Sequence, residues 1–156
     1  MRHVAFKGLF AAAIAAGGAA QAAAPEARNP FHCSIAFQVS YELAKAAQGA
    51  DSLLSRDLHS RMVWQAFAAA KFPKAGDPQA EADALRRVFT ADPEAGMAMA
   101  AACMRRQDAH PSFREARLEK QVRDGFPLEP LSTRASLEQL KGVFQRSSGS
   151  ASTHQE

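Results

Sequence analysis

Residues 29–37 read N-P-F-H-C-S-I-A-F, and this stretch joins a helix start to one of only two cysteines in the chain. Asn29 followed by Pro30 is typical of an N-cap residue and the first helical position. The stretch therefore predicts a helix that carries Cys33 in its first turn. The other cysteine is Cys103, far along the chain. Whether the two sulfurs bond to each other decides how the helices are arranged.

Further helix starts follow the same chemistry. Asp77 before Pro78 and Asp92 before Pro93 again place a capping carboxylate ahead of a proline. Apolar residues recur at helical spacing after these starts, whereas strand-like alternation and hairpin turns are absent. We expect five to six helices, at 30–48, from 51 or 52 to 72, from 78, at 93–107, at 111–124 and from about 133.

The sequence thus predicts an all-α protein with a single helical domain over residues 23–146. This length is enough to bury a core without a cofactor. Within it, F-P-L-E-P-L at 126–131 should be extended, because its two prolines disfavour a helix. The tail 147–156 reads S-S-G-S-A-S-T-H-Q-E, and its polar composition predicts disorder.

Residues 1–22 have the layout of a secretory signal peptide. Arg2 and Lys7 precede an uncharged, alanine-rich run over 8–24, and the sequence A-Q-A at 20–22 fits the cleavage rule for small residues. We expect cleavage after residue 22 and export to the bacterial periplasm or the outside of the cell. A membrane anchor is the alternative, since a run of 17 residues is near the lower limit for a span.

The charge balance changes when the predicted signal peptide is removed. The full chain has 19 basic and 16 acidic side chains, a formal net charge of +3. Two of the basic residues and none of the acidic ones lie in residues 1–22, so the mature chain has a net charge of +1. No block of like charge remains, and no later run is long enough for a stable membrane span. We therefore expect no nucleic-acid partner.

The two cysteines are expected to form a disulfide. Cys33 lies near the start of the first predicted helix and Cys103 near the end of the fourth. Short connections favour antiparallel neighbours, so four alternating helices would bring these two ends together in an antiparallel bundle. An oxidising compartment also favours the bond. A redox-active pair would use C-x-x-C, which is absent.

A soft-metal site is the alternative use of Cys103. Met99 and Cys103 lie four residues apart on one face of a predicted helix, and His110 follows shortly after. Thioether and thiolate groups suit Cu(I), so the three residues define a copper-carrier hypothesis. Methionine at helical spacing is more often a core residue that fills gaps between alanines. We therefore expect no bound metal and no other cofactor.

No motif for catalysis stands out. The sequence has no H-E-x-x-H, no G-x-S-x-G and no glycine-rich loop for phosphate. Most aspartates, Asp57 among them, lie at or near predicted helix starts, where capping or the helix dipole explains them. The single tryptophan, Trp64, lies in helical register with predicted core residues. We expect no catalytic residues, and the alternative is an envelope hydrolase whose site is assembled across helices.

The preferred functional hypothesis is a small exported protein that acts by binding another macromolecule. The partner would be a protein or another envelope component. A well-specified helical fold without a catalytic set motivates this hypothesis. An acid-activated chaperone is one form that it could take. Protonation of the 16 acidic side chains at low pH would leave a strongly positive chain and a loosened fold.

Overall fold

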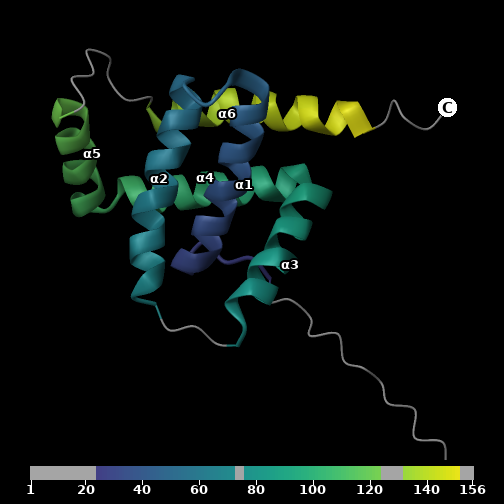
Figure 1. Ribbon diagram of the computed structural model, residues 1–156, viewed down its shortest axis with the longest axis horizontal. Helices are drawn as coiled ribbons and strands as arrows, with labels where there is room; N and C mark the ends of the chain where they lie inside the picture. Colours follow the sequence, from purple (N-terminus) through teal and green to yellow (C-terminus); the bar gives the residue numbers. More distant parts are fainter. Residues whose placement is uncertain (1–23, 73–75, 124–131, 152–156) are drawn as a thin grey trace, which may run out of the picture.

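The computed structural model describes residues 24–72, 76–123 and 132–151 (Figure 1). The predicted signal peptide and the segment 126–131 lie outside these residues. The described part is built from helices, without a strand, which confirms the all-α prediction. The helices are α1 (Pro30–Gln48), α2 (Leu53–Ala70), α3 (Pro78–Ala91), α4 (Pro93–Asp108), α5 (Pro111–Arg123) and α6 (Thr133–Ala151).

Three helices begin where the capping residues predicted. The side chains of Asn29, Asp77 and Asp92 each accept a hydrogen bond from a backbone N–H in the first turn of the helix that follows, at 2.9–3.0 Å. A proline occupies the start of each of these helices. α1 ends at Gly49, whose φ of 87° suits a residue without a side chain.

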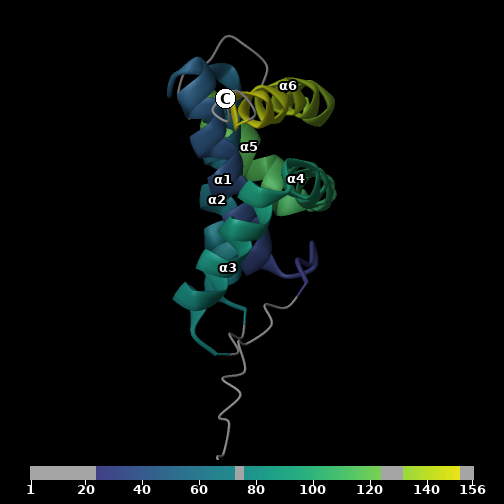
Figure 2. The same cartoon turned by 90° about the vertical axis from the view of Figure 1, so that its right-hand side faces the viewer.

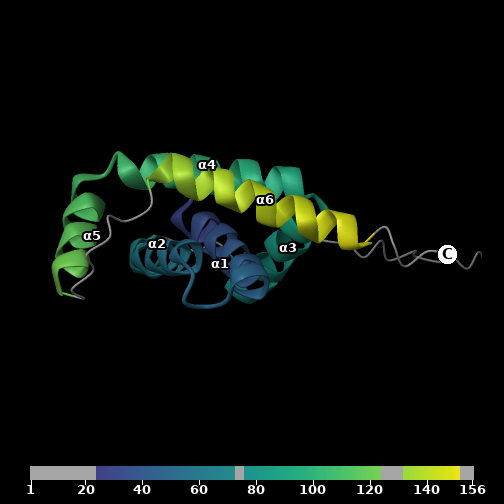
Figure 3. The same cartoon turned by 90° about the horizontal axis from the view of Figure 1, so that it is seen from above.

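The helices form two layers that cross. α1 lies between α2 and α3 and runs opposite to α2 but in the same general direction as α3 (Figure 1). α4 and α6 lie together across one face of this layer (Figure 3). Figure 2 shows α4 and α6 nearly end-on beside α1, α2 and α3. α5 continues from α4 at one side of the molecule.

The direction of α4 differs from the predicted antiparallel bundle. We expected α4 to run antiparallel to α1, whereas it crosses α1 (Figure 1). The cause lies in the connection, because Asp92 alone joins α3 to α4 and serves both as C-cap and as N-cap. Antiparallel helix pairs need a loop of about 2–5 residues. One residue turns the chain without reversing it.

The core lies between the two layers. Its largest fully buried apolar side chains are Phe37, Leu54, Leu58, Leu85, Phe89, Met104, Leu140 and Val143. The layers approach closely at Gly96 in α4. A Cβ atom at this glycine would lie 3.1 Å from the Phe89 carbonyl oxygen and 3.2 Å from the Phe144 ring.

The last helix is longer than the sequence predicted. α6 reaches Ala151, so residues 147–151 of the predicted disordered tail are helical. Polar composition argues against burial but not against continuing a helix. A helix anchored by buried Leu140 and Phe144 extends at little cost, because nucleation is the expensive step. Within the described residues, no helix combines the length and apolarity that a bilayer span requires.

Candidate functional site

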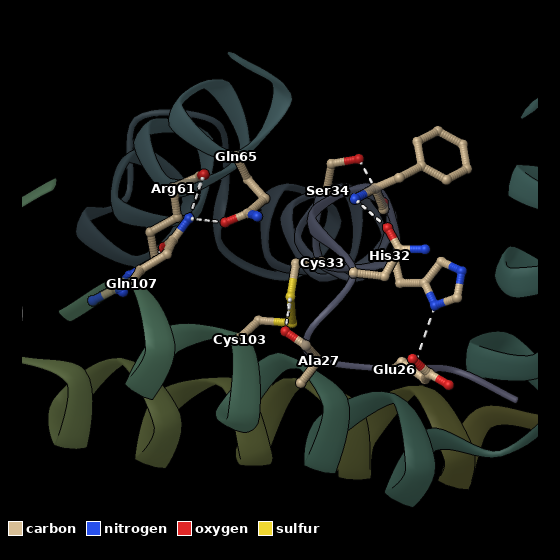
Figure 4. The surroundings of a disulfide bond; sticks show 11 residues. Glu26, Ala27, His32, Cys33, Ser34, Arg61, Gln65, Cys103 and Gln107 are labelled. Atoms are coloured by element: carbon tan, nitrogen blue, oxygen red, sulfur yellow. Dashed lines mark hydrogen bonds between the residues drawn. A yellow bond between two sulfur atoms is a disulfide. The ribbon is translucent and has the colours of Figure 1, made fainter. Parts of the chain in front are cut away.

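The predicted disulfide is present. Cys33 and Cys103 are bonded, their Cα atoms are 5.6 Å apart, and both residues are buried. The bond joins the first turn of α1 to the C-terminal half of α4 (Figure 4). The sequence therefore predicted the right pair, but the two cysteines meet because α4 crosses α1 and not because the two helices are antiparallel.

The copper-carrier hypothesis loses its thiolate, because the sulfur of Cys103 is bonded to Cys33. Met99 is buried in the core, whereas His110 lies on the surface with its ring 5.3 Å from the Trp64 ring. Within residues 24–72, 76–123 and 132–151, no three His, Cys, Asp or Glu side chains gather as a metal site. The three proposed ligands thus do not form one accessible cluster while the disulfide is intact.

The segment before α1 covers the disulfide. The carbonyl oxygen of Ala27 lies 3.4 Å from the Cys33 sulfur (Figure 4). His32 Nδ1 accepts a hydrogen bond from the backbone N–H of Glu26 at 3.0 Å, so its Nε2 carries the proton and donates to Glu81 at 2.7 Å. His32 is buried, and both of its ring nitrogens are used. These two hydrogen bonds of His32 attach the segment before α1, and also α3, to α1.

Arg61 is a buried charge that the sequence analysis did not single out. It is 0% exposed, and its Nε donates to Asp57 at 3.0 Å. Its Nη1 donates to Asp108 in α4 at 3.1 Å, and its Nη2 donates to Thr133 in α6 at 3.2 Å. The guanidinium carbon lies 5.3 Å from the centre of the Phe113 ring in α5. One side chain of α2 thus contacts α4, α5 and α6.

Further polar groups complete this network. Asp57 also accepts a hydrogen bond from Ser136 at 2.7 Å, and Gln107 donates to the Arg61 carbonyl oxygen and to Gln65, each at 2.9 Å. Apart from the Asp57–Arg61 pair within α2, most of these contacts join different helices, so the network holds the helices together. The i, i+4 spacing of Asp57 and Arg61 is the signal that could have revealed it. In the sequence alone this spacing is ambiguous, because a role at the helix start also explains the aspartate.

A shallow depression lies where α4 meets α5. It has a volume of about 260 Å³ and is lined by Arg106, Ala109, His110 and Pro111. No carboxylate is among these lining residues, so the depression lacks the acid–base pair that the hydrolase alternative requires. Trp64 packs nearby, with its ring 5.2 Å from that of Phe113. The tryptophan is half-buried and contacts the His110 and Phe113 rings outside the core, whereas its register predicted a core position.

The outer face of α2 carries three of the five large apolar side chains that are exposed in the described residues. We call it the α2 crest, and it comprises Leu53, Arg56, Ser60, Val63, Phe67 and Ala70. Phe67 is 71% exposed, Leu53 43% and Val63 40%. Phe72, just beyond the helix, is also 43% exposed. The opposite side of α2 carries Leu58, which is buried in the core.

The charges of α2 are divided between its two sides. Asp57 and Arg61 are buried and paired with each other, whereas the exposed charges are Arg56 on the crest and Lys71 at the C-cap. Residues 62–70 carry no charge. The C-terminal half of the crest is therefore uncharged, although the surface as a whole is rich in charged residues.

Similarity does not assign the chain to a known group. No protein-family model, no curated protein and no solved structure matches it. The surfaces and polar groups of the described residues are therefore the guide to its function. Among these, the α2 crest is the feature that internal packing leaves unexplained.

Proposed function

We propose that this protein is exported to the periplasm or the cell exterior and acts there by binding another macromolecule through the α2 crest. The exposure of Phe67 carries the proposal. Phe67 lies in the regular helix α2 and is 71% exposed to solvent. Val63, one turn earlier in the same helix, is 40% exposed. Contiguous exposed apolar side chains mark interaction sites, because covering them removes apolar surface from water.

The placement of the polar residues also supports binding over catalysis. Arg61 and Asp57 bond to each other inside the protein, and His32 uses both ring nitrogens for internal contacts. The depression beside His110 offers a histidine and an arginine without a lining carboxylate. Within the described residues, the hydrolase alternative thus gains no specific support, whereas the binding hypothesis gains an exposed surface.

The test is a pull-down from envelope extract of the native cells. The wild-type protein should recover a component above background, and Phe67→Ser should lose it. Val88→Ser is the matched control, since Val88 lies on α3 and is also exposed, at 36%. Circular dichroism shows whether both variants fold. Recovery of nothing by the wild type, or undiminished recovery by Phe67→Ser, would contradict the proposal.

Export is tested by the intact mass of the protein in a periplasmic fraction. We expect a chain that begins after residue 22 and has no thiol reactive toward an alkylating reagent until it is reduced. Chain of full length in the cytoplasmic fraction, with both thiols reactive, would contradict this part of the proposal.

A further inference from the structure

We infer that the α2 crest binds the α2 crest of a second copy of this chain, with the two helices antiparallel. The inference rests on the proposed function, because it names the partner of the same surface. Its support comes from the spacing of the crest residues, from the sizes of the side chains that would meet, and from the charges at the two ends of α2.

The spacing is that of a helix that pairs with another helix. Crest residues occur at 53, 56, 60, 63, 67 and 70, so the steps alternate between three and four residues. This alternation keeps one stripe of side chains facing a partner helix in a coiled coil. On α2 the stripe points away from the core, because the contacts of Arg61 with α4 and α6 come from the opposite side.

In two of its three kinds of layer, the antiparallel register matches a larger side chain with a smaller one. A two-fold axis midway along the crest places Leu53 against Ala70 of the second copy, and Ser60 against its Val63. The remaining layer places Arg56 on the Phe67 ring of the second copy. An arginine over an aromatic ring is a favourable cation–π contact. Symmetry repeats each layer, so the pairing closes at two copies.

The charges at the two ends of α2 select this direction. Asp51 precedes the helix and Lys71 caps its end, and both are exposed. Antiparallel docking brings each Lys71 to the Asp51 of the other copy, which gives two pairs of opposite charge. Parallel docking would instead bring Asp51 to Asp51 and Lys71 to Lys71, and like charges repel. A lipid surface or an unrelated partner would not require this internal match.

Sedimentation equilibrium of the disulfide-intact mature chain tests the inference. Over a micromolar to near-millimolar series, the wild type should show reversible association to twice the monomer mass, and Phe67→Ser should stay monomeric. Lys71→Glu and Asp51→Lys should each weaken association by about tenfold at low salt, since each disrupts two symmetric ion pairs. Combining the two substitutions should restore most of the affinity.

The outcomes separate this inference from the proposed function. A wild type that stays monomeric throughout, or a combined variant no better than either single variant, would overturn the antiparallel pairing. A monomer that still recovers an envelope protein through Phe67 would overturn the pairing and leave the proposed function standing. A monomer that instead binds vesicles containing phosphatidylglycerol would also overturn it. A dimer that recovers nothing from the extract would support the pairing and count against the proposed function.

Discussion

Replacing Arg61 by methionine should strongly destabilise the fold. Methionine fills much of the buried volume and removes the charge. The Asp57 side chain is 4% exposed, so its carboxylate would remain buried and lose the Arg61 guanidinium, whereas Asp108, with 32% side-chain exposure, keeps access to water. Removing one partner of a buried ion pair costs about 3–5 kcal/mol. This loss is a large share of a typical free energy of unfolding of about 5–15 kcal/mol.

Urea unfolding of the disulfide-intact protein, followed by far-UV circular dichroism, measures this change. The midpoint should fall while the dependence on denaturant stays the same, because the surface exposed on unfolding is similar. Arg134→Met is the control. Arg134 pairs with Glu138 at 3.1 Å, but the two side chains are 89% and 67% exposed. Loss of such a pair should cost less than about 1 kcal/mol.

A double substitution tests whether the buried charge is the cause. Arg61→Met combined with Asp57→Asn removes both charges and leaves an acceptor for the Ser136 hydroxyl. The combined loss should be smaller than the sum of the two single losses by about 0.5–3 kcal/mol, the usual coupling of contacting residues. Strict additivity, or an Arg61→Met variant within about 1 kcal/mol of the wild type, would refute this reasoning.

Two further predictions concern the disulfide and the closest packing. Joint replacement of Cys33 and Cys103 by alanine should lower the free energy of unfolding in urea by about 4 kcal/mol, because the bond spans 70 residues of sequence. A loss below about 1 kcal/mol would contradict the chain-entropy argument. Gly96→Ala should destabilise by about 1 kcal/mol, since its Cβ would lie 3.1 Å from the Phe89 carbonyl oxygen. A Cβ atom at Gly142 would meet one side-chain nitrogen at 3.5 Å, so Gly142→Ala should stabilise the fold by about 0.5–1 kcal/mol. Equal changes in melting temperature for the two glycine variants would contradict the close packing at Gly96.

The Arg61 network and the disulfide hold different parts of the molecule. The disulfide joins α1 to α4, whereas Arg61 joins α2 to α4, α5 and α6. α4 takes part in both connections and so ties its layer to α1 and to α2. The Arg61 contacts also fix the inner side of α2. The α2 crest is therefore presented on a rigid support.

The sequence alone determined the helices and the pair of bonded cysteines. Helix starts depend on groups within one turn, such as the Asn29 side chain and the N–H of Phe31, so local chemistry is enough to place them. The disulfide followed from having only two cysteines in a chain expected to be exported. The proposed exported location also comes from the sequence, because residues 1–22 lie outside the described part.

Only the tertiary structure decided how these helices cross and which charges are buried. The one-residue connection at Asp92 fixed the direction of α4. Counting alternating helices along the sequence does not predict this direction. In the sequence, Arg61 does not differ from an ordinary arginine on a helix surface. Its burial results from the packing of α4 and α6 against α2. The α2 crest likewise became visible as a surface only when the other side of the helix was occupied. Burial and crossing depend on contacts between residues far apart in sequence, and local patterns do not determine them.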